Sequence, residues 1–225
     1  MNLDHIKQKI LTSTVNSYPY DHVIIDDFLD IDDYKSCYQN LLNVQTRKEN
    51  QLYDNARNGS KRQYNSAEGN VDFQKVLDAF SNQELADIIA NKFNYDEPLY
   101  PDPTFEGGGL TFSPPGTFLR YHADFNYSSN AERYRVINAI LYLNYDYQTA
   151  NGGHLHLIDP KSNTVEGVVE PVFNRCVMFK TNKNTPHGVN RNNDDFTRVS
   201  FNCYFYSDKP LLQDEVEPHR TLWVE

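Results

Sequence analysis

Hydrophobic and polar positions follow different periods in the two halves of the chain. In the first 95 residues, residues 2–13 have a helical composition, and apolar side chains recur at helical spacing within residues 71–80 and 82–93. A capping-box sequence, Ser-Asn-Gln-Glu at 81–84, precedes the third of these segments. From residue 107 onward, short apolar runs alternate with turn residues. We therefore predict a helical layer that supports a β-rich second half.

The first half also contains non-helical or mixed segments. Residues 22–29 predict a strand that turns into a helix capped by Asp30. The apolar face of that helix would consist of Tyr34, Cys37, Tyr38, Leu41 and Leu42.

Residues 46–70 are polar and concentrate positive charge. The basic side chains in this segment are Arg47, Lys48, Arg57, Lys61 and Arg62. We predict a solvated loop, and we keep a second hypothesis in which this loop is a lid over an active site.

The second half reads as a set of short strands. Residues 136–143 are apolar on nearly both faces, which indicates a central strand. Further strands are predicted at 154–158, 175–180 and 199–206. Short strands at even spacing favour a sandwich or a barrel.

The candidate chemistry of the chain lies in this β-rich half. His122 and Asp124 are two residues apart, so on a strand both side chains point to the same face. With His187 they would form two imidazoles and one carboxylate, the ligand set of non-heme Fe(II) oxygenases. A His-x-Asp pair alone is weak evidence, because it also occurs at solvated strand ends. Arg198 and Ser200 share a face of a later strand, and arginine suits a planar carboxylate.

In their order and spacing along the chain, these residues and the segments around them resemble those of the Fe(II)/2-oxoglutarate-dependent dioxygenases, specifically of the prolyl-4-hydroxylase-like branch. The resemblance covers roughly half the chain, which is far more specific than a single motif. The matching segments are 107–110, 115–119, 122–125, 141–144, 152–155, 170–175, 187–188 and 198–200. One departure is His154, where the family often has Glu or an apolar residue after the paired glycines.

The resemblance implies a fold and a reaction. The expected fold is mainly β with an α layer (α+β), in which a double-stranded β-helix, the cupin-like jelly roll, is supported by N-terminal helices. The implied reaction uses Fe(II), O2 and 2-oxoglutarate as co-substrate, and it hydroxylates an unactivated C–H bond while releasing succinate and CO2. Retention of Asp124 favours hydroxylation over halogenation, because halogenating relatives have a small residue there.

Site roles follow from the same resemblance. His122, Asp124 and His187 would be the catalytic residues and the metal ligands. Arg198, with Tyr142 and Ser200, would bind the distal carboxylate of 2-oxoglutarate. A purely structural role for Tyr142, as a core aromatic, is nearly as well supported by the sequence.

Substrate contacts are predicted less sharply. The candidates are Arg120, Tyr127, Asn138, Asn202 and Tyr204, and Arg135 also borders the loop after the first ligand. His154 and His156 are interpreted as surface or second-layer residues, with substrate contact as the lesser alternative.

The amino-acid composition restricts the kinds of partner and the cellular compartment that this protein can have. The chain has 225 residues, 39% hydrophobic residues, a mean hydropathy of -0.71 and a formal net charge of -10. The acidic balance argues against general nucleic-acid binding, and no apolar run approaches the ~20 residues that cross a bilayer. No signal peptide is visible, and three widely spaced cysteines are typical of reduced thiols. We expect a cytoplasmic, single-domain protein over 1–225, with support in 1–95 and the dioxygenase core in 96–225.

Several functions remain open at this level. The leading hypothesis is a hydroxylase of a peptidyl or free amino acid, with proline as one candidate. The alternatives are a small metabolite or sugar-linked substrate, a non-catalytic cupin-like metal-binding barrel, and a Zn(II) isomerase or hydrolase. The Arg198 and Ser200 pair argues against the last two, because neither needs a buried carboxylate clamp. The sequence leaves the oligomeric state open.

Overall fold

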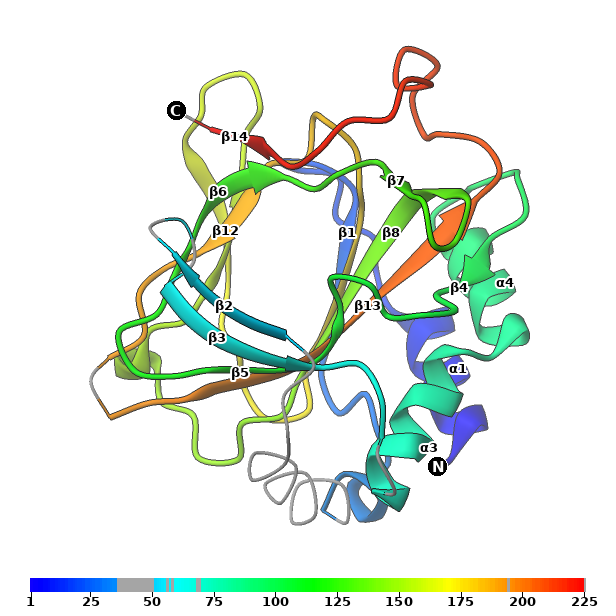
Figure 1. Ribbon diagram of the computed structural model, residues 1–225. Coiled ribbons are helices and arrows are strands. Elements are labelled where there is room, and N and C mark those ends of the chain that lie inside the picture. Colours follow the sequence, from blue (N-terminus) through cyan, green and yellow to red (C-terminus); the bar gives the residue numbers. More distant parts are fainter. Residues whose placement is uncertain (36–50, 56, 58, 68–69, 194, 225) are drawn as a thin grey trace.

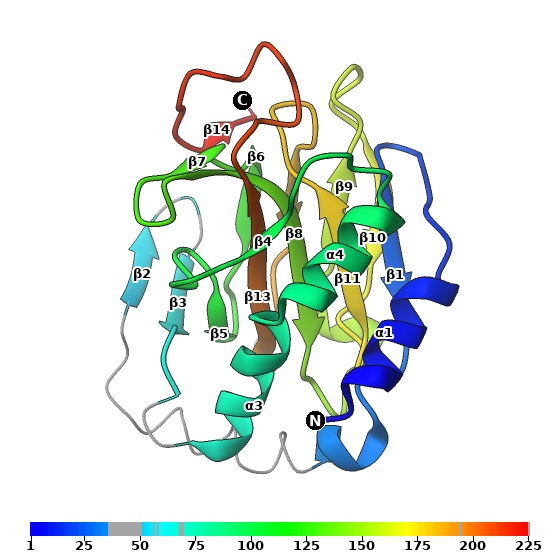
Figure 2. The same ribbon diagram turned by 90° about the vertical axis from the view of Figure 1, so that its right-hand side faces the viewer.

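Two antiparallel β-sheets face each other, and the helices cover the outer face of the larger one (Figure 1, Figure 2). The computed structural model describes residues 1–35, 51–55, 57, 59–67, 70–193 and 195–224. Within these residues the larger sheet has nine strands and the smaller one has five.

The larger sheet has the order β1-β11-β8-β13-β5-β3-β2, with β4 on β13 and β7 on β8. Its strands are β1 (His22–Ile25), β2 (Gln51–Asn55), β3 (Gly59–Tyr64), β4 (Tyr100–Pro101), β5 (Gly109–Ser113), β7 (Tyr127–Ser128), β8 (Arg133–Tyr142), β11 (Cys176–Lys180) and β13 (Arg198–Ser207). Strand β8 is central and almost wholly buried, as its apolar pattern predicts. Cys176 and Cys203 are buried free thiols in this sheet.

The smaller sheet has the order β10-β9-β12-β6-β14. Its strands are β6 (Leu119–Ala123), β9 (Leu155–Ile158), β10 (Val165–Val169), β12 (His187–Val189) and β14 (Leu222–Trp223), and a 3₁₀ turn, η2 (Thr149–Asn151), precedes β9. Two antiparallel sheets in this arrangement form the jelly roll that was expected.

Three helices have described bounds, α1 (Leu3–Thr12), α3 (Val71–Phe80) and α4 (Gln83–Lys92). Each begins with an asparagine whose side chain accepts a hydrogen bond from a backbone N–H in the first turn. For α4 this residue is Asn82, so the prediction of a capping box that starts at Ser81 is wrong; Ser81 instead ends α3. The helix predicted after Asp30 is helical over 31–35, and Cys37, Tyr38, Leu41 and Leu42 lie outside the described residues.

Residues 46–70 differ most from the sequence-based prediction. The segment contains the hairpin of β2 and β3, and β3 pairs with β5. The polar composition misled the prediction because a strand that borders a polar cavity needs no alternation of apolar residues. Gln63, for example, is buried and donates a hydrogen bond from its amide to the carbonyl of Gly108. Arg47 and Lys48 lie outside the described residues.

The main core joins the larger sheet to the helices. Phe201 of β13 lies at its centre, with ring centroids 5.1 Å from Phe80, 6.1 Å from Phe73 and 5.6 Å from Phe105. In the part of the chain that the structure describes, no helix has the length and apolar character needed to cross a membrane.

Phe201→Ala should therefore destabilise the fold strongly. Loss of a fully buried phenylalanine that contacts three other rings should lower the free energy of unfolding by about 3–5 kcal/mol. Denaturant titration followed by circular dichroism measures this change. Val168→Ala, at an exposed position of β10, is the matched control. Equal stability of the two variants would contradict the core assignment.

Candidate active site

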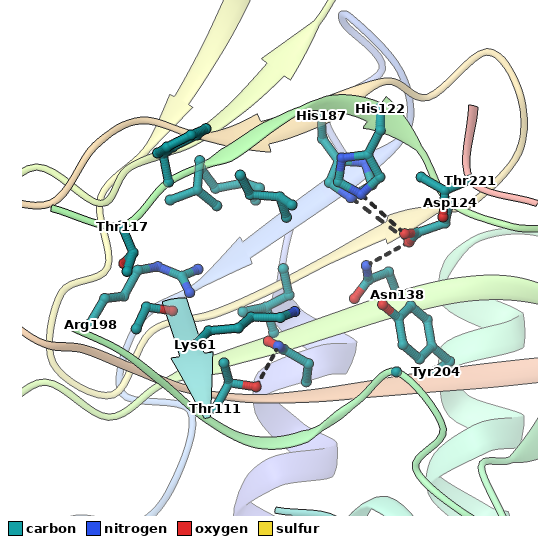
Figure 3. A pocket seen from close by; sticks show the side chains of 18 of the residues that line it. Lys61, Thr111, Thr117, His122, Asp124, Asn138, His187, Arg198, Tyr204 and Thr221 are labelled. Carbon is teal, nitrogen blue, oxygen red and sulfur yellow. Dashed lines mark hydrogen bonds and ion pairs between the residues drawn. The ribbon is translucent and has the colours of Figure 1, made fainter. Parts of the chain in front are cut away.

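Two neighbouring strands of the smaller sheet bring His122, Asp124 and His187 together. In the register of β6 and β12, His122 lies directly opposite His187, and Asp124 follows the end of β6. One ligand atom from each of the three buried residues lies within 4.8 Å of the other two. The Nε2 atoms of His122 and His187 lie 3.4 and 3.8 Å from the Asp124 carboxylate oxygens (Figure 3).

Backbone carbonyls orient both imidazoles. Nδ1 of His122 lies 2.8 Å from the carbonyl oxygen of Arg120, and Nδ1 of His187 lies 3.1 Å from that of Thr185. Each carbonyl can accept a hydrogen bond only if Nδ1 carries the proton. The lone pair is then on Nε2, which faces Asp124, as a metal ligand requires.

The electrostatics of the three residues suit a cation. Burial acts to raise the pKa of Asp124, but His187, His122 and Arg135 outweigh it, so that this pKa lies below its usual value. Burial lowers the pKa of His187 to about 4 and keeps the ring neutral. Asn138 donates to the second Asp124 oxygen at 3.2 Å. An ionised Asp124 carboxylate and a neutral His187 imidazole suit a divalent ion, and two imidazoles with one carboxylate leave coordination positions open, as Fe(II) oxygenases require.

Arg198 lies at the other end of the same cavity (Figure 3). It is buried on β13, where its Nε donates to the Gly153 carbonyl oxygen at 3.0 Å and its Nη1 donates to Ser200 Oγ at 3.1 Å. No carboxylate of the described residues lies within ion-pair distance of its guanidinium. Because an uncompensated buried cation is costly, this end of the cavity fits the carboxylate of a ligand.

Tyr142 and Gly153 complete the surroundings of Arg198. The Arg198 guanidinium carbon lies 4.9 Å from the Tyr142 ring centroid. The buried Tyr142 hydroxyl has no hydrogen-bond partner of acceptable geometry among the described residues, so it is available to a ligand. Gly153 has a φ of +71°, and an added Cβ would lie 2.7 Å from Asn192 Oδ1. The second of the paired glycines is therefore needed for the turn whose carbonyl orients Arg198.

The cavity between the triad and Arg198 measures about 310 Å³. Of the predicted substrate residues, Asn138, Asn202 and Tyr204 line it. Arg120 does not line it and is exposed, so the structure does not support its prediction as a substrate contact. The pairing of β6 with β12 shifts register between His122 and Leu119, so the simple alternation fails and Leu119 faces the cavity instead.

Tyr127 is also absent from the described lining of the cavity. Its ring packs edge-on against Tyr134, with centroids 5.2 Å apart, on the β7–β8 pair. The structure therefore does not support its prediction as a substrate contact either. His156 and His154 lie outside the described lining too. They face Tyr121 and the Thr149 carbonyl respectively.

Several further residues line the cavity, although the sequence analysis did not name them as site residues or named them only as neighbours of a loop. Arg135 is 2% exposed, and its guanidinium lies between the rings of Phe125 and Tyr204, at 3.6 and 3.3 Å from their centroids. Burial acts to lower its pKa, but Tyr204, Tyr206 and Asp124 raise it above its ordinary value, so the group is a permanent cation. The other cavity-lining residues that the sequence analysis did not predict as site residues are Lys61, Thr111, Thr117, Asn192, Thr221 and Trp223. The basic composition of 46–70 was the only sequence signal for Lys61.

A sequence model described as the 2OG-Fe(II) oxygenase superfamily matches residues 101–206 of this chain. These residues include the triad, Tyr142 and the Arg198–Ser200 pair. The match covers just under half of the chain, and over these residues the chain is similar to the 2OG-Fe(II) oxygenase superfamily. The match and the buried triad together identify a 2-oxoglutarate-dependent dioxygenase that uses Fe(II), 2-oxoglutarate and O2, and the donor set fits this use. No curated protein matches the sequence.

Solved structures show how this oxygenase is folded. A prolyl-4-hydroxylase from Pseudomonas putida is 21% identical, with a TM-score of 0.62 over 91% of this chain and 98% of that one. A Trichoplax adhaerens prolyl hydroxylase, in complex with a hypoxia inducible factor peptide fragment, is 18% identical, with a TM-score of 0.59 over 92% and 89%. The epimerase SnoN from nogalamycin biosynthesis, described as non-heme and alpha ketoglutarate dependent, is 13% identical, with a TM-score of 0.58 over 91% and 82%. These likenesses confirm the predicted double-stranded β-helix and the prolyl-4-hydroxylase-like form of the fold.

Proposed function

We propose that this oxygenase hydroxylates an unactivated C–H bond of an amino acid, either free or within a peptide. One atom of O2 enters the substrate as a hydroxyl group. The other oxidises 2-oxoglutarate, which leaves as succinate and CO2. The bound ferrous ion supplies the O2 activation, and the protein supplies its ligands, the orientation of both organic molecules and the exclusion of water.

The observation that carries the proposal is the shared cavity. The three ligand atoms of His122, Asp124 and His187 face the space that Arg198 closes at its other end. In this arrangement the triad holds the ferrous ion, and Arg198 with Ser200 and Tyr142 binds the distal carboxylate of 2-oxoglutarate. Retention of Asp124 supports hydroxylation, since it leaves no room for a halide ligand. Asn138 donates to Asp124 and holds that carboxylate in place.

Different observations favour two different classes of substrate. The Trichoplax neighbour holds a peptide, which favours a peptidyl substrate. The SnoN neighbour and the small cavity favour the second candidate, a small metabolite. A cavity of this volume is at the lower end of the range for small-molecule sites, about 300–1,000 Å³. A non-catalytic cupin-like barrel and a Zn(II) isomerase or hydrolase lose support, because the sequence model that matches residues 101–206 is that of an oxygenase superfamily.

The test is a coupled measurement on the Fe(II)-loaded protein. Succinate release from 2-oxoglutarate should occur under air and should rise when the substrate is present. A screen of free amino acids and peptides, followed by mass spectrometry, should find one product that is heavier by one oxygen. The absence of iron-dependent succinate release would refute the proposal. Stimulated release with an unoxidised acceptor would refute hydroxylation alone.

A further inference from the structure

The indole of Trp223 lies in one row with the two imidazoles of the triad. Strand β6 pairs with β12 on one side, where His122 lies opposite His187, and with β14 on the other, where His122 lies opposite Trp223. Residues directly opposite each other on neighbouring strands point to the same face of a sheet. The ring centroids are 4.6 Å apart for the two imidazoles and 5.1 Å apart for His122 and the indole. Trp223 therefore extends the row of proposed metal ligands by one strand.

Strand β14 turns alternate side chains toward the cavity. Thr221 and Trp223 both line the cavity, whereas Leu222 between them is 42% exposed. This is the alternation that an extended strand imposes on successive side chains. Figure 3 shows Thr221 beside His122 and Asp124, at the end of the cavity that is opposite Arg198. The edge strand thus forms part of the cavity wall at the triad.

Trp223 and Arg198 lie on opposite sides of the proposed metal ligands. Arg198 donates to the carbonyl oxygen of Gly153, which precedes β9. In the smaller sheet β9 is separated from β14 by β12 and β6, the strands that carry His187 and His122. In the proposed function, 2-oxoglutarate extends from the metal to Arg198. The space beside Trp223 is therefore left for the primary substrate.

Backbone contacts hold this part of the wall in position. The N–H of Val224 donates to the carbonyl oxygen of Tyr121 at 2.9 Å. On the other side of Trp223, the N–H of His219 donates at 2.8 Å to the side chain of Asn126, which is buried just after Asp124 in the chain. A surface that is already ordered before binding loses little conformational entropy when a ligand packs against it.

The chemistry of this wall favours an uncharged, apolar group. The indole is partly exposed, so it offers apolar surface that a ligand can remove from water. An aromatic face can also bind a cation. However, the Arg57 guanidinium already lies 5.0 Å from the centroid of the indole, and the proposed ferrous site is next to its other neighbour, His122. A further positive charge would be repelled by both.

We propose that Trp223 is a specificity-determining residue of this oxygenase, and that its indole packs against the apolar side chain of the amino acid that is oxidised. The inference rests on the proposed function, because that function assigns the Arg198 end of the cavity to 2-oxoglutarate. Strand β14 thus supplies one wall of the site for the primary substrate.

Intrinsic fluorescence tests this inference directly, because Trp223 is the single tryptophan of the chain. The Fe(II)-loaded protein, with saturating 2-oxoglutarate and without O2, is titrated with three pairs of probes. The pairs are L-proline and trans-4-hydroxy-L-proline, L-valine and L-threonine, and L-leucine and L-asparagine, each as the free amino acid and as its N-acetyl amide. In each pair the second member replaces an apolar group by a polar one of similar size.

At least one apolar probe should change the emission of Trp223 saturably. It should bind more tightly than its polar counterpart by about tenfold or more, the discrimination expected of an apolar contact. Equal binding within every pair would overturn the proposal. So would binding that leaves the emission unchanged, or the lack of a saturable change with any apolar probe at millimolar concentration.

Variants assign the preference to the residue. Trp223→Ala should weaken binding of the preferred apolar probe by about tenfold or more, and Trp223→Phe should restore part of the affinity. Leu222→Ala, at the exposed neighbouring position, is the matched control and should bind the probe as the wild type does. The shift in thermal midpoint gives the Kd in all variants, including those that lack tryptophan.

Two further readouts separate a substrate contact from an indirect effect through His122. The iron content of Trp223→Ala after dialysis, and its KM for 2-oxoglutarate in turnover without a primary substrate, should stay close to those of the wild type. Loss of iron or a steep rise in that KM, with an unchanged preference for apolar probes, would overturn the inference. Apolar preference without any succinate release under air would instead refute the proposed function and leave the Trp223 wall standing.

Discussion

Asp124→Ala should abolish iron-dependent turnover of 2-oxoglutarate. The substitution removes the one carboxylate of the triad and leaves two buried imidazoles with no anion between them. Loss of a residue that only supports a metal ligand typically costs 10–100-fold in metal affinity or activity, so loss of a ligand itself should exceed about 100-fold. Succinate release and the iron content after dialysis measure the effect, and His122→Ala and His187→Ala should behave alike.

A histidine outside the triad provides the control for this series. His154→Ala removes a half-buried imidazole that faces the Thr149 carbonyl and does not line the described cavity. It should retain both iron and succinate release. Normal turnover in Asp124→Ala, or equal losses in His154→Ala and His122→Ala, would show that the metal ligands are wrongly assigned. Circular dichroism separates either result from misfolding.

Arg198→Ala should raise the KM for 2-oxoglutarate steeply while iron binding is retained. Truncation of one partner of a buried, hydrogen-bonded charge pair costs about 2–5 kcal/mol, which corresponds to a factor of roughly 30 to several thousand. The variant leaves Ser200 and Tyr142 in place, so Arg198→Lys should recover part of the affinity through its point charge. Initial rates of succinate release at varied 2-oxoglutarate concentration give the KM.

Arg133→Ala serves as the comparison for Arg198. Arg133 makes an ion pair with Asp208 at 2.9 Å, and it lies outside the described lining of the cavity. Its KM for 2-oxoglutarate should match the wild type. A KM in Arg198→Ala that equals this control would rule out a clamp at Arg198, whatever the loss in overall rate.

How much of the site could be predicted depends on which residues follow simple strand rules. His122 and Asp124 could be paired from alternation, and their geometry agrees with that expectation. His187 was joined to them because a second imidazole completes the Fe(II) ligand set, and the family resemblance supported that choice. The two histidines lie together because β6 and β12 pair with His122 opposite His187. No local sequence pattern predicts that register. Arg198 and Ser200 were paired by the same alternation, and they share a hydrogen bond.

The failures have equally specific causes. Arg120 was expected beside His122, but the register shift in β6 turns Leu119 to the cavity instead. Lys61 was interpreted as part of a solvated loop because β3 carries almost no apolar alternation, and its strand conformation depends on pairing with β5. Arg135 could be named only as a neighbour of the loop after Asp124. Its burial depends on stacking with rings from two other parts of the chain.

Strand β14 is paired with the strand that carries His122, one of the proposed metal ligands. Strand β14 pairs Trp223 with His122, and the indole and imidazole centroids lie 5.1 Å apart. Val224 donates its backbone N–H to Tyr121, and the Arg57 guanidinium, from the turn of the β2–β3 hairpin, lies 5.0 Å from the indole. A partner protein or a protease that separates β14 from β6 would therefore disturb the proposed ligand His122, whereas α1 lies away from this strand pair (Figure 1). Strand β14 thus couples an edge strand of the smaller sheet to the position of the His122 imidazole.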